Sequence, residues 1–552
     1  HHQKYKNTVL RFFFGLLAAA LVMLLISNNG ILFLISWEFM AISAVFLINM
    51  DDTEAEVRGA AWLYFVTTRL STMCIIALLL LWNATSGSFD MVPIKSEVSE
   101  LARFTFFSLT ILAFGIKAGI MPLHIWLPPA HASAPSHISA MLSGVVIKMG
   151  VYGLLRFLSL LPGFSEGYGY AILTLGGISA VMGVCFALGQ HDLKRLLAYH
   201  SIENIGIIFM GIGIALIGGA LGEEAWIVLG ISAALLHTWN HCLFKSVLFF
   251  GAGAVIMKTK TRLINEMGGL AKHMPITAIL FFFAALAISG LPPLNGFVSE
   301  LLVYIGLFRS LGIMGDSARI AMTLFAPLLA ITGALALACF VKVYGTVFLG
   351  EPRSVYPSKV QEPSPSIYIS MAVLVAACFI IGLIPAIFSN ILNAAVCAWS
   401  GGEEILPDVS TLAPLHYIGI CGTILILACL TCFLALVCLL GSRPIDLAPT
   451  WGCGYSQPTA RMQYTSSSFA QVLVESFSWA LRPKVKRTSS DSILPGHSAF
   501  EIHVADVVLD KVMVPLYRNF INKTQWFHWI QNGYLHLYLV YIFLILAIFL
   551  LI

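Results

Sequence analysis

Long apolar runs, separated by short polar stretches, recur along the whole chain. Most are close to the roughly 20 residues that an α-helix needs to cross the hydrocarbon core of a bilayer. The pattern therefore predicts an all-α, polytopic bundle of transmembrane helices. The thirteen predicted spans are 10–26, 30–49, 60–82, 103–131, 135–158, 169–189, 195–219, 226–257, 275–308, 319–349, 366–390, 413–440 and 533–552.

The fourth and ninth spans contain residues that interrupt a helix. Gly119 and Pro122 lie within the fourth span, and the ninth contains the sequence SGLPPLNG at 289–296. Broken helices are tolerated in a membrane only where protein or a water-filled cavity receives the freed backbone groups. We therefore expect discontinuous helices at both places.

The composition agrees with a membrane protein. Hydrophobic residues make up 59% of the 552 residues, charged residues only 11%, and the mean hydropathy is +0.88. A soluble domain carries about 25% charged residues, so water is excluded as the solvent for most of this surface. The net charge of +4 is too small and too scattered to indicate nucleic acid. Cys429 and Cys432 form a CxxC inside an apolar run, which we interpret as packing, and no iron–sulfur or zinc spacing occurs.

The loops predict an orientation and a long extramembrane tail. Lysine and arginine gather in alternate loops, and the positive-inside rule places those loops in the cytoplasm. Residues 441–532 would form a cytoplasmic segment, with a basic run at 482–487 and a linker-like stretch after it. Apolar residues then recur every four positions from Val504 to Phe520, which predicts an amphipathic helix kinked at Pro515. This helix would be an interfacial brace or a rod that couples subunits.

A series of ionisable residues lies inside the predicted spans. A charge at the bilayer centre costs about 3 kcal/mol on insertion scales, so isolated examples are seldom accidental. His237, His241 and Lys245 are four residues apart and line one face of a helix. The complete series, which we predict to form a proton-translocation path, is Glu38, Lys117, Lys148, Glu203, His237, His241, Lys245, Glu300 and Lys342.

The order of these residues predicts two five-helix units of opposite orientation. Each unit carries a glutamate in its second helix, a charged residue at the break in its fourth and a lysine in its fifth. Because five is odd, the second unit is inverted in the membrane, as in many transporters. The predicted parts are a first half at 1–158, an inverted second half at 159–349, two further membrane helices at 350–440, a linker with a lateral helix at 441–532, and a final membrane helix at 533–552.

Buried lysine, glutamate and histidine suit proton transfer. Desolvation disfavours the charged form of lysine and of glutamate, and histidine titrates near neutral pH, so such groups can exchange protons. The alternative for the series is a set of structural ion pairs. For Lys342, which lies near its helix end, snorkelling to the interface is the alternative. His124, His131 and His137 would serve an interface, proton uptake or metal binding.

Several stretches resemble the antiporter-like subunits of respiratory complex I and of Mrp-type sodium/proton antiporters. They are SWEFMAIS, GIKAGIMPLHIWLPPAHASAPSHISAMLSGVVIKMGVYGLLR, DLKRLLAYHSIENIG, HTWNHCLFKSVLFFGAG and SGLPPLNGFVSE. The resemblance implies that Glu38, Lys117 and Lys148 match the first-half proton residues of that family. It also implies that His237, His241 and Lys245 match the central relay, and Glu300 the terminal site.

The chain resembles one branch in particular, the membrane subunits of formate hydrogenlyase and hydrogenase 4 in group 4 nickel–iron hydrogenases. HSIENIG places Glu203 where complex I relatives have an uncharged residue, and WGCGYSQPTARMQYTSSSFAQ at 451–471 is similar to a C-terminal motif of that branch. The chain does not begin with Met, and the branch implies three further helices before residue 1.

The resemblance implies a proton-translocating subunit of a hydrogenase or formate hydrogenlyase complex in a bacterial or archaeal cytoplasmic membrane. The nickel–iron site and iron–sulfur clusters would lie in partner subunits, namely a peripheral hydrogenase-like arm beside other membrane subunits, and no cofactor or redox chemistry is expected in this chain. The transported ion would be a proton or Na⁺. The alternatives are a subunit of a complex I-type NADH:quinone oxidoreductase, an Mrp-type Na⁺/H⁺ antiporter, and a membrane anchor that does not pump.

Overall fold

The computed structural model describes most of the chain in two compact units. These units are residues 1–504 and residues 505–552, and each is described by itself below. The described residues are 8–94, 98–161, 163–309, 311, 322–356, 360–401, 406–441, 459–460, 462–488, 499–525, 540–541 and 543–545.

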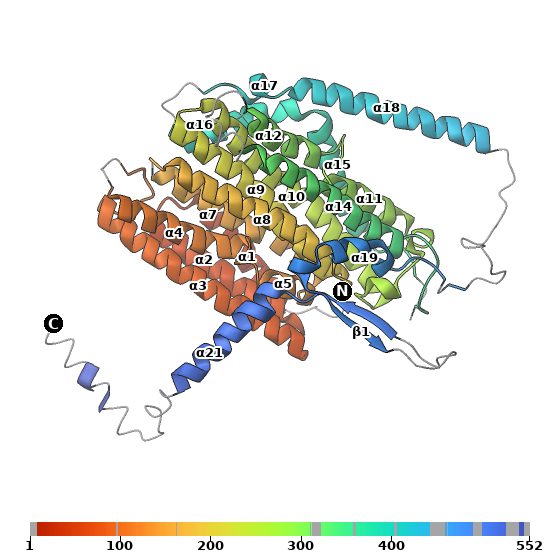
Figure 1. Ribbon diagram of the computed structural model, residues 1–552, viewed down its shortest axis with the longest axis horizontal. Helices are drawn as coiled ribbons and strands as arrows, with labels where there is room; N and C mark the ends of the chain where they lie inside the picture. Colours follow the sequence, from red (N-terminus) through yellow and green to blue (C-terminus); the bar gives the residue numbers. More distant parts are fainter. Residues whose placement is uncertain are drawn as a thin grey trace. The chain divides into compact units, whose positions relative to one another are not determined.

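The first unit is a bundle of helices, as predicted. Among the described residues, eleven helices are long and apolar enough to cross a membrane. In Figure 1 the orange α2–α4 lie on one side of α8–α10, and the green α14 and α15 lie on the other. The principal helices are α1 (Thr8–Ile26), α2 (Gly30–Ile48), α3 (Ala55–Ser86), α4 (Glu100–Ala118), α5 (Leu127–Ser133), α6 (Ser136–Met141), the π-helix η2 (Leu142–Val146), α7 (Ile147–Leu160), α8 (Glu166–Leu188), α9 (Leu193–Leu221), α10 (Glu224–Thr259), α11 (Pro275–Ile288), α12 (Asn295–Arg309), α14 (Phe325–Val347), α15 (Pro365–Leu383), α16 (Ser389–Ser400), α17 (Val409–Leu412) and α18 (Leu415–Leu440).

Helices α8, α9 and α10 form the buried centre of this unit. Every residue of α9 from Leu196 to Gly218 is buried, which requires neighbouring helices on all sides of α9. A Cβ added at Gly206 would lie 2.5 Å from the backbone nitrogen of Ala180, so α8 and α9 approach at backbone distance there. This close packing positions the ionisable residues of α9 against their neighbours.

Both predicted breaks are confirmed. Helix α4 ends at Ala118, and Gly119 caps it with a left-handed φ of +77° before α5 begins at Leu127. Helix α11 ends at Ile288 and α12 begins at Asn295, with Gly290 at a φ of +64° between them. The sequence signals were therefore sufficient to locate the two discontinuous helices.

Other boundaries differ from the prediction. The eleventh span ends at Leu383 rather than at residue 390, because Pro385 opens a short 3₁₀ turn (η6, Pro385–Phe388) that leads into α16. The broken ninth span forms α11 and α12, so it is not among the eleven long helices. Most of the predicted thirteenth span, 533–552, lies outside the described residues.

Gly382 holds the second break against α15. A Cβ at Gly382 would overlap the carbonyl oxygen of Pro293, whereas a Cβ at Gly333 of α14 would meet nothing within 4 Å. We expect Gly382→Ala to destabilise the protein by about 1–3 kcal/mol, since overpacking of a rigid backbone contact costs that much. Thermal unfolding of the purified protein would show a lower midpoint for Gly382→Ala and no comparable drop for Gly333→Ala. Equal midpoints would contradict this assignment.

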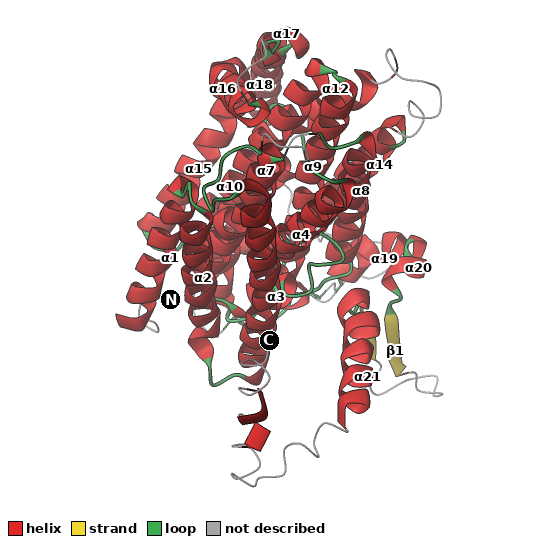
Figure 2. Cartoon of the chain, turned by 90° about the vertical axis from the view of Figure 1, so that its left-hand side faces the viewer, coloured by secondary structure: helices red, strands yellow, loops and turns green. Residues whose placement is uncertain are grey.

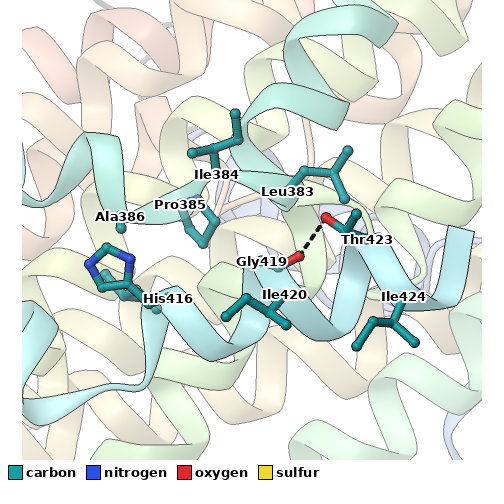
Figure 3. A pocket seen from close by; sticks show the side chains of 10 residues that line it. Leu383, Ile384, Pro385, Ala386, His416, Gly419, Ile420, Thr423 and Ile424 are labelled. Atoms are coloured by element: carbon teal, nitrogen blue, oxygen red, sulfur yellow. Dashed lines mark hydrogen bonds between the residues drawn. The ribbon is translucent and has the colours of Figure 1, made fainter. Parts of the chain in front are cut away.

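Helix α18 packs beside this break through its first turns only. A cavity of about 360 Å³ lies between Leu383–Ala386 and α18, lined by His416, Gly419 and Ile420 among others (Figure 3). Cys429 and Cys432 are exposed on the later turns of α18. The packing predicted for this CxxC therefore does not occur among the described residues of the chain.

The segment after α18 contains a hairpin that was not predicted. Helices α19 (Ser466–Ser476) and α20 (Ser478–Leu481) precede the antiparallel strands β1 (Lys484–Thr488) and β2 (Ala499–His503), drawn in yellow in Figure 2. Residues 484–487 of the basic run thus belong to β1 of a two-stranded sheet. Of the WGCGY-containing motif, residues 451–458 and 461 lie outside the described residues.

The second unit contains the predicted amphipathic helix. It begins as the π-helix η7 (Val508–Met513) and continues as α21 (Val514–Thr524), with Pro515 in the first turn of α21. Leu516 and Phe520 are exposed on it, which fits an apolar stripe that needs a membrane or a protein surface. Val504 precedes the helix and belongs to the first unit, so the stripe begins later than predicted.

Candidate functional site

The polar residues inside the bundle begin with an ion pair between α2 and α3. Arg69 of α3 binds the carboxylate of Glu38 at the middle of α2, and Thr72 donates a hydrogen bond to the same carboxylate. The side chains of Arg69 and Glu38 are 31% and 24% exposed. Arg69 was absent from the predicted series, although it lies within the predicted third span and the residue type alone could have indicated it.

Lys117 occupies the last turn of α4, next to the first break. Its side chain is fully buried, and Nζ donates to the hydroxyl of Tyr64 at 2.7 Å. The ammonium also lies 5.7 Å from the ring of Trp37 and 4.9 Å from that of Tyr64, close enough for cation–π attraction. Glu38 acts on Lys117 electrostatically, but its direct ion pair is with Arg69. Glu38 therefore contacts Arg69 directly and interacts with Lys117 at longer range.

Lys148 connects the first half of the series to α10. It follows the π-helix η2, and its Nζ donates to the carbonyl of Ser143 and lies 2.6 Å from Nδ1 of His241. Sequence reasoning placed both residues in the path, and the structure brings them into direct contact. A lysine and an imidazole at this distance can exchange a proton without an intervening water.

Helix α10 carries the three-residue face that was predicted from its spacing. His237, His241 and Lys245 are all buried. Nζ of Lys245 donates to the carbonyl of Leu197 on α9, and Lys148 and Glu203 both act on Lys245 electrostatically. The face therefore lies between Lys148 on one side and α9 on the other.

His237 links α9 and α12. Its Nε2 lies 3.1 Å from Oδ1 of Asn204, and its Nδ1 lies 2.9 Å from the hydroxyl of Ser299. Glu300 follows Ser299 and is also buried, with its carboxylate so close to Gly290 that a Cβ there would lie 2.5 Å from Oε2. The second break thus leaves room for a carboxylate beside the bent backbone.

Glu203 has a partner on its own helix. Nδ1 of His200 pairs with Oε2 of Glu203, three residues later on α9, and both side chains are at most 1% exposed. The ring of His200 stands over Phe340 of α14, with 4.7 Å between the ring centroids. His200 was not predicted as a site residue, although one helical turn separates it from Glu203 and this spacing was visible in the sequence.

Lys342 is fully buried, so the snorkelling interpretation is wrong. Its Nζ donates to the carbonyls of Leu188 and Gln190, both at 2.7 Å, where α8 ends and turns toward α9. A lysine near a helix end reaches the interface only when nothing covers it, and here the end of α8 covers it. The side chain instead faces into the bundle.

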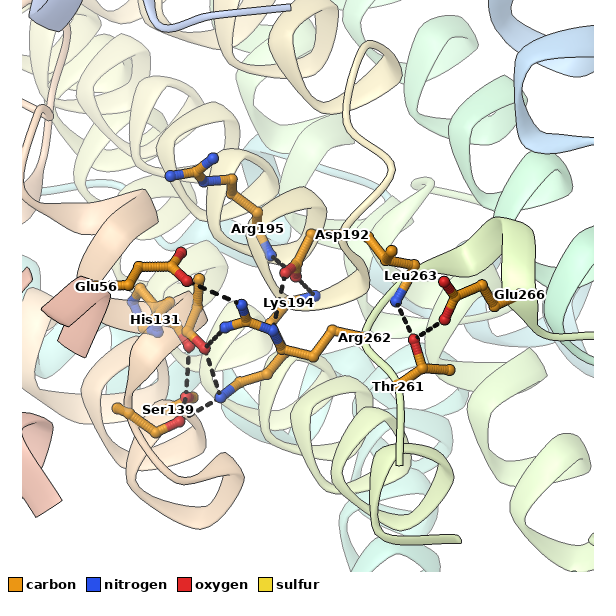
Figure 4. A network of polar contacts seen from close by, with 12 residues as sticks. Glu56, His131, Ser139, Asp192, Lys194, Arg195, Thr261, Arg262, Leu263 and Glu266 are labelled. Carbon is orange, nitrogen blue, oxygen red and sulfur yellow. Dashed lines mark hydrogen bonds and ion pairs between the residues drawn. The ribbon is translucent and has the colours of Figure 1, made fainter. Parts of the chain in front are cut away.

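Lys194, one residue before the predicted seventh span, is also buried. It lies near a cavity of about 270 Å³ lined by acidic and basic residues, and its Nζ donates to the carbonyls of Ala132 and Ala134. Figure 4 shows Arg262 nearby, which bridges Glu56 and Asp192 at 3.3 and 3.2 Å. Asp192 also caps the start of α9 through its carboxylate.

The three histidines near the first break do not gather at one point. His131 is buried and stacks on Phe249, and Lys148, Lys194 and Lys245 act on it electrostatically. The ring of His124 lies 6.3 Å from that of Tyr199, while His137 is only partly buried. Among the residues that the structure describes, no three His, Cys, Asp or Glu side chains are arranged to hold a metal ion.

Comparison with known proteins identifies the family. The sequence profile described as "NADH:quinone oxidoreductase/Mrp antiporter, TM" matches residues 27–325. The chain belongs to this family. Formate hydrogenlyase subunit 3 of Escherichia coli (strain K12) is 37% identical over 487 residues, which cover 87% of this chain and 76% of that protein. Hydrogenase-4 component B of the same organism is 39% identical over 376 residues, 67% of this chain.

This antiporter-family chain spans 56% of the length of hydrogenase-4 component B. Solved structures share its fold. A chain of the membrane-bound sulfane sulfur reductase, an archaeal respiratory membrane complex, superposes with a TM-score of 0.75 at 23% identity, over 100% of this chain and 85% of that chain. A chain of the Mrp complex from Dietzia sp. gives a TM-score of 0.59 at 20% identity, over 70% of this chain and 77% of that chain.

The comparisons confirm the predicted resemblance, both to the antiporter-like superfamily and to the hydrogenase branch. The chain is an antiporter-like, multi-pass membrane protein. The assignment of the individual residues to a proton path, and the inverted relation of the two halves, remain predictions.

Proposed function

We propose that this protein translocates protons as the antiporter-like membrane subunit of a nickel–iron hydrogenase or formate hydrogenlyase-type complex of a cytoplasmic membrane. The observation that carries this proposal is the set of buried ionisable residues from Lys117 to Lys342, most of which lie beside another polar group. Buried charges of this kind in membrane helices mark ion pathways and proton relays.

The drive for translocation would come from partner subunits. The names of its relatives, hydrogenase-4 component B and formate hydrogenlyase subunit 3, support a hydrogenase-type partner. Electron transfer at metal centres in such a partner would shift the ion pairs of this chain and so load or unload the lysines. The work stored is bounded, because one charge moved against 100 mV stores about 2.3 kcal/mol.

Glu300→Gln tests the proposal at the second break. Glutamine keeps the size and hydrogen bonding of Glu300 but cannot carry a proton, so we expect proton translocation to fall about 100-fold, the lower range for a lost acid–base group. The assay would use inside-out vesicles containing the whole complex, a pH-sensitive dye, and reduced methyl viologen as the electron source. Glu224→Gln, at the exposed start of α10, is the matched control.

The same assay separates the alternatives. A membrane anchor that does not pump predicts electron transfer with no proton movement in the unaltered complex. A self-standing Mrp-type antiporter predicts Na⁺/H⁺ exchange without any electron source, and a complex I-type subunit predicts NADH-dependent translocation. Co-purification of a nickel–iron subunit would support the hydrogenase-type assignment. Normal proton translocation by an assembled Glu300→Gln complex would contradict the proposed path.

A further inference from the structure

We propose that His200 is a proton-relay residue that joins Lys245 and Glu203, at the centre of the bundle, to Lys342 on α14. This inference rests on the proposed function and extends it, because neither the predicted series nor the family resemblance assigned a role to His200. His200 lies on α9 and interacts with residues of α10 and α14.

The contacts of His200 place it between the two lysines. Its Nδ1 pairs with Glu203, and its ring packs on Phe340, two residues before Lys342 on α14. Lys245 and Lys342 both act on His200 electrostatically. Lys245 is held on the carbonyl of Leu197, one turn before His200 on α9, so its ammonium approaches the same part of that helix.

One ring nitrogen of His200 is available for transfer. Nε2 is buried and has no hydrogen-bond partner among the residues that the structure describes. A buried imidazole with an unpaired nitrogen is costly, so a structural histidine would be expected to satisfy both nitrogens. A relay needs the opposite arrangement, in which one nitrogen exchanges with a fixed carboxylate and the other can receive or release a proton.

The titratable groups around His200 are few and come from each neighbouring element. They are Glu203 on its own helix, Lys245 on α10, and Cys339 and Lys342 on α14, while Cys185 on α8 and Glu300 on α12 interact electrostatically with Glu203. Within the described part of the chain, the hydrogen bonds of Lys342 go to the carbonyl oxygens of Leu188 and Gln190. His200 therefore offers an imidazole that interacts with Lys342. In the proposed transfer, Nε2 takes up a proton and Nδ1 releases one to Glu203, so the number of protons on the ring is unchanged.

Paired variants of the whole complex in inside-out vesicles test this inference. We expect His200→Gln to lower proton translocation at least tenfold, with electron transfer from reduced methyl viologen to the complex retained. His416→Gln, an exposed histidine on α18, is the control that should stay unchanged. Lys245→Gln reports on the proposed path itself.

A second variant distinguishes a relay from a packing role. His200→Ala removes the ring, and added imidazole should restore translocation several-fold if proton transfer was the loss, whereas a packing defect would not respond. If Lys245→Gln blocks translocation but both His200 variants assemble and translocate normally, the relay role is wrong and the proposed function stands. If Lys245→Gln also translocates normally, the proposed function fails, and the relay role fails with it. Loss in His200→Ala without imidazole rescue overturns the relay role as well.

Discussion

Replacing Lys148 with glutamine is expected to reduce proton translocation by about 100-fold or more, the range for removal of a positioned acid–base group. Lys148 touches His241 at 2.6 Å and is the direct contact between the first half of the series and α10. Glutamine is one atom shorter than lysine but keeps an N–H donor and fits a helix well, so the helix should still form. The loss would therefore report on proton transfer rather than on folding.

The measurement is dye quenching in inside-out vesicles, normalised to the amount of assembled complex. Lys260→Gln is the matched control, because Lys260 is exposed just after α10 and is not a member of the series. We expect the control to translocate protons at the rate of the unaltered protein. Full activity in Lys148→Gln would contradict a path through this residue.

Replacing Arg69 with glutamine is expected to lower both the yield and the thermal stability of the complex. Glu38 lies at the middle of α2, and without Arg69 it becomes an unpaired carboxylate at mid-span, where a lone charge costs about 3 kcal/mol. Thr72 still donates one hydrogen bond to Glu38, so the loss should be partial. The amount of complex extracted from membranes and its unfolding midpoint measure the effect.

The double variant Glu38→Gln, Arg69→Gln gives the sharper result. Removing both charges together removes the cost of leaving one unpaired, so yield and unfolding midpoint should recover toward those of the unaltered protein. Proton translocation should stay low, because the proposed path loses Glu38. A double variant as unstable as Arg69→Gln would show that the ion pair is not what stabilises this contact.

The membrane explains why much of the fold was predictable. A bilayer requires about 20 apolar residues per span and internal hydrogen bonding, so both the spans and the all-α class follow from hydropathy. The breaks were equally visible, since Gly119 and the SGLPPLNG sequence cannot continue a regular helix. The end of the eleventh span was missed because the apolar run continues through Pro385 while the helix does not.

The partners of the buried charges were less predictable because they depend on packing between distant helices. Glu38 pairs with Arg69 rather than with Lys117, and only the packing of α2 against α3 decides this. Lys342 was placed near an interface by its position along α14, but the end of α8 covers it. The β1–β2 hairpin was missed because its first strand is too polar and too short to show an apolar alternation.

The π-helix η2 sets the angular phase of everything that follows it on α7. A residue advances about 100° around a regular helix, and a π turn accommodates one extra residue without changing the direction of the chain. With η2 in place, Lys148 points at His241. A regular α-helix over Leu142–Val146 would leave the lysine about 100° out of phase with that ring. A change of this turn from π to α would therefore turn Lys148 away from His241 and break the contact between them.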